Sequence, residues 1–131
     1  MPFILPDGIE YVGLALISTQ LVLLFQEITV GHWRKISKIK YPQLYAEKAE
    51  MEANPDAVTF NCAQRAHANT LENVPIILVG TLVTAMKYPI FAAVTCGLWS
   101  FSKFRYTRGY LKGADKRNSR GGILGSIMQL R

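Results

Sequence analysis

The sequence lacks several features that would settle its class directly. It has only two cysteines, Cys62 and Cys96, with no CxxC pair and no Cys/His spacing suited to a metal ion. Charged residues make up only 18% of the 131 residues, while hydrophobic residues make up 50%, which excludes a disordered polar chain. No internal repeat or low-complexity tract is present. We therefore expect a single domain with buried, reduced thiols and no metal site.

The sequence also lacks a long uncharged hydrophobic run. Its four apolar segments are residues 11–26, 73–86, 88–102 and 121–130. None of them reaches the ~18–20 residues of a simple membrane-spanning helix, so hydropathy alone is compatible with a soluble helical bundle. However, segments such as LALISTQLVLLF and IILVGTLVTAM are apolar all round, without the charged face of a surface helix. This pattern favours a membrane protein.

The charges are unevenly distributed along the chain. The net charge is +6, and the basic residues gather in two alternate connections, within residues 34–48 and 103–120. The N-terminal segment and the turn around residue 88 hold one base between them, together with Asp7 and Glu10. An oriented membrane protein keeps its basic connections in the cytosol, so these two connections are expected there. The N-terminal segment has no basic residue before its apolar run, which indicates an uncleaved anchor. Nucleic acid is not an expected partner.

The predicted fold is an all-α integral membrane four-helix bundle. The helices are expected at about 9–36, 58–86, 89–112 and 120–131, with a cytosolic loop over 37–57. Asp56 is the predicted N-cap of the second helix, Pro75 is predicted to kink it, and Pro89 suits the first turn of the third. Residues 121–131 would span only ~17 Å, about half of the ~30 Å hydrocarbon core. The fourth helix is therefore expected to be truncated.

One polar stripe lies in the run FNCAQRAHANTLENVP. Its members Asn61, Arg65, Asn69 and Glu72 are spaced by four, four and three residues, which places them on one helical face. Charged residues within a membrane cost at least ~2.5–3.5 kcal/mol each, so this face needs a partner or a wet cavity. Either the stripe joins helices, or it binds a zwitterionic peptide-like ligand through a bidentate arginine and a carboxylate. His67 lies on nearly the opposite face and should contact something else.

A second stripe lies on the predicted third helix. Trp99, Lys103, Tyr106 and Tyr110 are spaced by four, three and four residues and share a face. These residues form either an aromatic belt whose base reaches to the cytosolic interface, or part of an anion-binding site.

Further bases follow the tyrosines. Lys116, Arg117 and Arg120 set the topology of the chain, and they could also bind an anion or stabilise a thiolate. Arg108 and Lys112 are spaced to face away from the tyrosines, where they would contact lipid headgroups.

Four motifs together carry a family resemblance. NCAQRAHANTLENVP, RYTRGY, RKISKIKYPQLY and KRNSRGGILGS resemble the membrane-associated eicosanoid and glutathione metabolism family over nearly the whole chain. The resemblance implies a homotrimer that binds glutathione as co-substrate on its cytosolic side, between neighbouring protomers. It also implies a lipophilic substrate, contact with membrane lipids, and a place in the endoplasmic reticulum or outer mitochondrial membrane.

The resemblance also implies roles for individual residues. The positions that match the family's glutathione-binding residues are Arg65, Asn69, Glu72, Tyr106 and Tyr110. Arg117 matches the residue that activates the thiol. Arg34 and Lys35 match a basic pair that contacts glutathione or assists chemistry. Two positions depart from some relatives, which have glutamine at His67 and tyrosine at Asn73. Lys35 replaces an arginine of the family's cysteinyl-leukotriene synthase, and lysine cannot form the bidentate fork. That specific activity is therefore not implied.

The predicted function is a glutathione-dependent transferase with possible peroxidase activity. Its thiolate would attack a lipophilic electrophile or a lipid hydroperoxide that arrives from the bilayer. The alternative is a non-catalytic lipid-binding scaffold of the same fold. A further alternative is a structural membrane protein whose polar stripe only joins helices.

Overall fold

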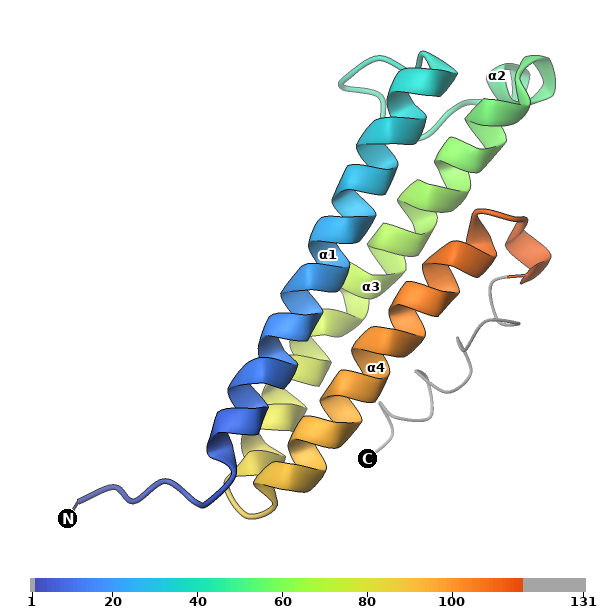
Figure 1. Cartoon of the computed structure of the whole chain (residues 1–131). Coiled ribbons are helices and arrows are strands. Elements are labelled where there is room, and N and C mark those ends of the chain that lie inside the picture. The colour runs from blue at the N-terminus through green and yellow to red at the C-terminus, as the bar shows by residue number, and fades with distance from the viewer. Residues whose placement is uncertain (1, 117–131) are drawn as a thin grey trace.

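The computed structural model describes residues 2–116, which form helices, turns and loops with no strand within that range. The helices are α1 (Ile9–Ser37), α2 (Lys48–Ala53), α3 (Pro55–Ala85) and α4 (Pro89–Tyr110). The three long helices pack against one another as a bundle, and α2 packs against α3 (Figure 1). At 1.5 Å per residue they are ~44, ~47 and ~33 Å long. Both α1 and α3 continue beyond the C-terminal end of α4 (Figure 1).

The start of α3 differs from the prediction. Asn54, in an extended conformation, is the N-cap, and its side chain accepts a hydrogen bond from the Asp56 amide at 3.0 Å. Pro55 then occupies the first helical turn, where its fixed φ is favourable and its missing N–H costs nothing. The predicted cap at Asp56 is therefore wrong, and the helix begins three residues before its expected start at about residue 58. Pro75 lies inside α3, which runs through it as one helix.

The connection between α1 and α3 is folded, where the sequence indicated only a polar loop. It contains α2, which begins with a capping box formed by Glu47 and Glu50. Asn61 of α3 holds this connection, because its side chain accepts from the Ala46 amide at 2.7 Å and donates to the Ala46 carbonyl at 3.0 Å. Asn61 therefore stabilises the connection between α1 and α3, a role that the other members of its stripe do not share.

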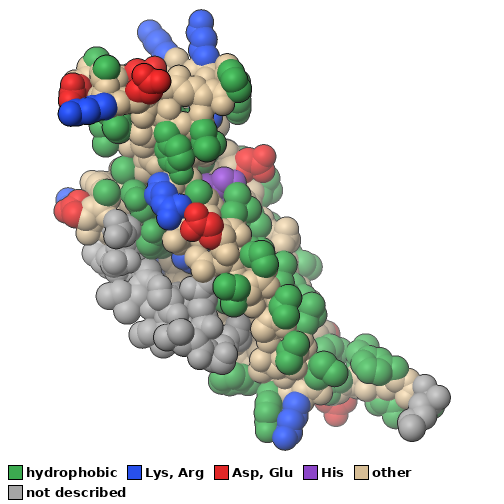
Figure 2. Space-filling model, turned by 180° about the vertical axis from the view of Figure 1, so that it is seen from behind, with side chains coloured by type: hydrophobic (Ala, Val, Ile, Leu, Met, Phe, Trp, Pro, Cys, Tyr) green, Lys and Arg blue, Asp and Glu red, His purple; other side chains and the backbone are tan. Residues whose placement is uncertain are grey.

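Hydrophobic side chains line much of the lower part of the bundle on the face seen in Figure 2. Large exposed side chains cover the outer faces of α1 and α3, among them Leu14, Leu21, Leu24, Ile28, Ile76, Val79, Leu82 and Val83. Among the described helices, α1 and α3 are long and apolar enough to cross a membrane. An apolar surface of this extent is unfavourable in water and is satisfied by lipid.

The helices approach closely through small residues. Ala15, Ala85, Ala92 and Cys96 are buried in one cluster with Trp99, which is fully buried. Small side chains let helices pack closely where lipid provides no hydrophobic driving force between them.

A buried polar contact joins the three long helices. Gln26 of α1 donates through Nε2 to Thr70 Oγ1 of α3 and to Thr107 Oγ1 of α4, both at 2.8 Å. All three side chains have no exposed area. Because an amide nitrogen carries two N–H donors, one side chain can satisfy both hydroxyls at once. Gln26 thus fixes how α4 sits against α3.

Replacing Gln26 with leucine is expected to destabilise the bundle by about 1–2 kcal/mol. Hydrogen bonds between membrane helices contribute ~0.6 kcal/mol on average and ~1.7 at most, and two are lost. Thermal unfolding of the purified protein measures the effect. Gln20→Leu is the matched control, because Gln20 is exposed on the same helix. Equal destabilisation by both variants would contradict this role.

Candidate functional site

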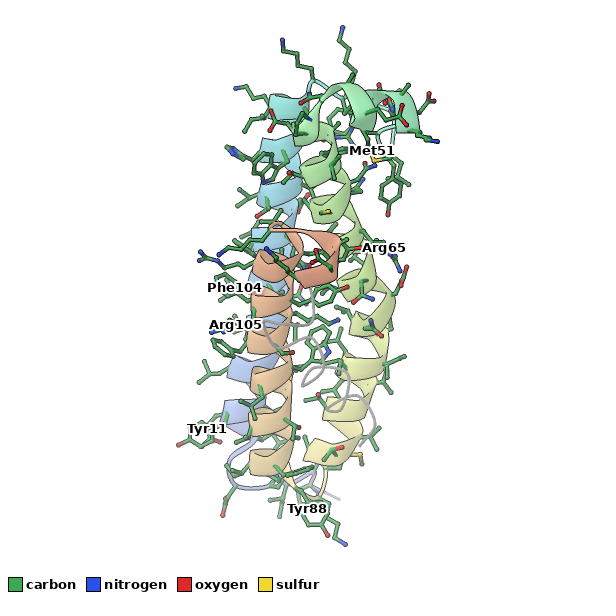
Figure 3. The ribbon with its side chains drawn as sticks, turned by 90° about the vertical axis from the view of Figure 1, so that its right-hand side faces the viewer. Tyr11, Met51, Arg65, Tyr88, Phe104 and Arg105 are labelled. Carbon is green, nitrogen blue, oxygen red and sulfur yellow. The ribbon has the colours of Figure 1, made fainter. Side chains whose placement is uncertain are left out.

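Arg65 and Glu72 form a partly exposed ion pair on α3. Arg65 Nη1 lies 2.9 Å from Glu72 Oε1, and their side chains are 45% and 57% exposed. Exposed pairs of this kind contribute only ~0.2–1 kcal/mol. A ligand with its own carboxylate and ammonium groups can therefore replace the pair at little cost. In Figure 3 Arg65 projects from α3 at about the level where α4 ends.

Asn69 lies between the two charged residues along α3 and contacts α4. Its Oδ1 accepts a hydrogen bond from Lys103 Nζ at 2.7 Å. Its backbone carbonyl accepts from Asn73 Nδ2 at 2.7 Å. The hydrogen bond from Lys103 of α4 fixes the orientation of the Asn69 side-chain amide.

Lys103 is buried, with only 3% of its surface exposed. Its Nζ lies 4.8 Å from the centroid of the Tyr106 ring and 5.9 Å from that of Trp99. The interpretation of Lys103 as a base that reaches to the membrane interface is therefore wrong. Burial is tolerated because Asn69 supplies an acceptor and the aromatic rings supply cation–π contacts. Lys103 was not among the predicted site residues, although its shared face with the tyrosines was a signal.

Tyr106 and Tyr110 pack beneath this face of α3. Their rings meet edge to face with centroids 5.6 Å apart, and both side chains are more than nine-tenths buried. They form a cluster with Cys62 and Ala66 of α3. The predicted residues Arg65, Asn69, Glu72, Tyr106 and Tyr110 thus belong to one region of the α3–α4 interface.

Arg34 and Lys35 lie elsewhere in the protomer. The Arg34 guanidinium donates to the Gln43 carbonyl at 2.7 Å and stacks over the Tyr41 ring, 4.2 Å from its centroid. It is 7% exposed and therefore holds the connection between α1 and α2. Lys35 is exposed and lines an open hollow of about 450 Å³ beside it. Within one chain the structure does not bring this pair together with Arg65.

His67 faces a separate, smaller hollow of about 260 Å³. Glu27, Arg34 and Gln64 also line it. His67 Nδ1 and Arg34 Nε are buried, and no described residue forms a hydrogen bond with either atom.

The predicted thiol-activating residue Arg117 lies outside the described residues. The same holds for Arg120 and for the predicted fourth helix over 120–131. The described chain ends at Lys116, shortly after the end of α4.

A comparison with models of known protein families identifies the family of this chain. The model of the membrane-associated eicosanoid and glutathione metabolism (MAPEG) family matches residues 12–130. The chain belongs to the MAPEG family. The family resemblance drawn from the sequence motifs is therefore confirmed. MAPEG proteins typically use glutathione, and the family includes transferases, peroxidases and other enzymes as well as members that are not enzymes. Together with the apolar helices α1 and α3, the match makes this MAPEG chain a membrane protein.

Proposed function

We propose that this MAPEG chain is a glutathione-dependent transferase or peroxidase, similar to microsomal glutathione S-transferase 3. It acts on lipophilic electrophiles or lipid hydroperoxides within the membrane. The observation that carries the proposal is the group on α3 and α4: an exposed Arg65–Glu72 pair beside Asn69, backed by buried tyrosines. This group supplies both signs of charge and an amide on one face.

The group matches the chemistry of glutathione. Arg65 grips one carboxylate through its planar fork, and Glu72 binds the ammonium group of the γ-glutamyl end. Asn69 pairs with a peptide amide, while Lys103 keeps the Asn69 side chain in place. The Arg65–Glu72 pair opens as the ligand enters, so each charge exchanges one partner for another.

The exposed Lys35 enters the site from a neighbouring protomer, and Arg34, whose guanidinium holds the Gln43 carbonyl, shapes the loop beside it. Their distance from the Arg65 group within one chain is what a site shared between protomers requires. We therefore propose a homotrimer whose glutathione sites lie between neighbours.

The chemistry is thiolate attack. Arg117 stabilises the glutathione thiolate, and Lys35 assists with a second positive charge. In conjugation the sulfur forms a C–S bond with the electrophile and a leaving group departs with its electron pair. In peroxide reduction the sulfur attacks the distal oxygen, which gives an alcohol and a sulfenic acid. A second glutathione then converts the sulfenic acid to a disulfide and water.

The proposed location is the endoplasmic reticulum membrane, with the outer mitochondrial membrane as the alternative, and the site faces the cytosol. Basic side chains at the end of the bundle that holds α2 support this orientation (Figure 2). A lipophilic substrate reaches the site through the bilayer, where it is concentrated.

The deciding experiment measures turnover of the purified trimer with glutathione. A lipid hydroperoxide and a conjugation substrate are tested side by side. We expect at least one reaction to exceed the uncatalysed rate and to saturate with glutathione. A folded trimer that binds lipid and accelerates neither reaction would favour the non-catalytic scaffold, and the proposal would be wrong.

Lys103→Met is expected to raise the KM for glutathione about tenfold with little change in kcat. The variant removes the donor that orients Asn69, and hydrogen bonds to charged groups contribute about 1.5–3 kcal/mol. Steady-state kinetics at varied glutathione separates the two parameters. Lys112→Met, in an exposed position after α4, should change neither. Lower heat stability with an unchanged KM would show that Lys103 is only structural.

A further inference from the structure

A groove runs along the seam between α1 and α4. It consists of three hollows of about 470, 370 and 380 Å³ in succession. The first and second share Ser18 and Gly97, and the second and third share Phe25. The three hollows therefore form one continuous path along the bundle.

The lining of the groove changes along its length. The first two hollows are almost entirely apolar. Their only shared hydroxyl, Ser18, donates to Ser100 Oγ at 2.8 Å, so it is already satisfied within the groove. The third hollow adds Thr29, His32 and Arg108 at the end of the bundle that carries the basic residues. One end thus suits hydrocarbon and the other suits an anion.

Within residues 2–116, no acidic side chain pairs with the arginine at the polar end. Arg108 is exposed, stacks over Phe104 with 5.9 Å to the ring centroid, and forms no ion pair with any described residue. Arg105, one turn away, stacks over Phe101 but lines none of the three hollows. Bases near the cytosolic leaflet attract anionic lipids by ~1 kcal/mol each.

The second and third hollows together match one leaflet of the bilayer in length. From Ser18 to His32, α1 rises ~21 Å at 1.5 Å per residue. Half of the ~30 Å hydrocarbon core is ~15 Å, which leaves the remaining length for a headgroup. A single acyl chain therefore fits between the polar end and the middle of the groove.

We propose that the α1–α4 groove binds one acyl chain of an anionic membrane phospholipid, with its phosphate at Arg108. This site is distinct from the proposed glutathione site. In Figure 3 the side chains of Tyr11, Phe104 and Arg105 project on one side of the bundle, and Arg65 projects on the other.

Two variants should weaken lipid binding by independent means, one by filling the groove and one by removing its charge. Each has a matched control. Gly97→Leu fills the point where the first two hollows meet, and a Cβ there meets no atom within 4 Å. Gly80→Leu is its control, because Gly80 lies on α3, away from the α1–α4 groove, and its Cβ also meets no atom within 4 Å. Arg108→Gln removes the charge at the polar end. Arg105→Gln is its control, because Arg105 lies one turn away and does not line the groove.

The experiment uses the purified full chain in phosphatidylcholine vesicles with a trace of spin-labelled phosphatidylglycerol. Electron paramagnetic resonance measures the motionally restricted fraction of the probe. We expect Gly97→Leu to weaken probe binding about tenfold, because a methylene contributes ~0.8 kcal/mol and leucine displaces two or more of them. Arg108→Gln should weaken it about fivefold. Both controls should bind like the unchanged protein.

Three outcomes would overturn the proposal. Equal restriction in all variants would show ordinary boundary lipid. Equal restriction of spin-labelled phosphatidylcholine and phosphatidylglycerol by the unchanged protein would show that the groove does not select an anion. Loss of the trimer in Gly97→Leu, with the probe still bound, would show that the seam is an interface between copies. If Gly97→Leu does not fold, the comparison of probe binding between Arg108→Gln and Arg105→Gln still tests the proposal. None of these results depends on glutathione binding.

Discussion

Replacing Arg65 with alanine is expected to weaken glutathione binding about 30-fold while the chain remains folded. Arg65 is half-exposed, and within the described chain its side chain pairs with Glu72 across two helical turns. For the stability of the fold, the variant loses only a weak surface ion pair. For glutathione binding, it loses a bidentate, charge-assisted contact. Charge-assisted hydrogen bonds contribute about 1.5–3 kcal/mol, which corresponds to about 10–150-fold in affinity.

Calorimetric titration of glutathione measures the loss in Arg65→Ala. Arg65→Lys should recover only part of the affinity, because lysine keeps the charge but not the planar fork. Arg105→Ala is the matched control, since Arg105 is an exposed arginine that projects from the other side of the bundle (Figure 3). Equal weakening by Arg65→Ala and Arg105→Ala would show that general positive charge, rather than this contact, attracts the ligand.

Replacing Arg117 with alanine is expected to lower kcat about 100-fold with only a modest loss of glutathione affinity. In the proposed mechanism this guanidinium stabilises the thiolate, and removing one group that stabilises developing charge commonly costs 100-fold or more. The effect therefore falls on turnover, whereas that of Arg65→Ala falls on binding.

Steady-state kinetics for Arg117→Ala, together with calorimetric titration, separates these effects. A second readout is the ultraviolet absorbance of the bound thiolate, which should disappear at neutral pH in Arg117→Ala and persist in Arg65→Ala at saturating glutathione. Arg120→Ala controls for the loss of one positive charge in the same part of the sequence. Equal loss of kcat and affinity in both Arg65→Ala and Arg117→Ala would contradict this division of roles.

The helical membrane class and the family could be predicted from the sequence for a physical reason. Apolar runs such as LALISTQLVLLF have no charged face, and a helix is the structure that satisfies every backbone group of such a run in lipid. The shared face of Trp99, Lys103, Tyr106 and Tyr110 also follows from helical spacing, and all four side chains are buried in the structure. Local periodicity carries this information.

The contacts between elements could not be predicted in the same way. The short helix α2 has six residues, too few to be stable alone, and it depends on Asn61 holding the adjacent Ala46. Asn54 and Asp56 are both good cap residues, and the predicted cap, Asp56, was the wrong one of the two. The choice became clear only with Pro55 in the first helical turn.

The candidate site shows the same limit. Its α3 members were predicted from spacing, because they lie on one element. The sequence left Lys103 open between the membrane interface and an anion-binding site, because its acceptor, Asn69, belongs to another helix. Arg34 was grouped with the glutathione-binding residues, yet it holds the Gln43 carbonyl of a loop whose path is not visible in the sequence. Gln26 was overlooked within an apolar run, although a lone amide there needs partners.

The most direct test of the account is whether glutathione protects the folded protein from heat. The melting temperature of the purified protein is measured with increasing glutathione, and separately with an equal mixture of free glutamate, cysteine and glycine. A ligand at 100 times its Kd adds about 2.7 kcal/mol of stability. The account predicts a concentration-dependent rise with glutathione, no rise with the amino-acid mixture, and a curve displaced to higher concentration in Arg65→Ala. An unchanged melting temperature at every glutathione concentration would contradict it.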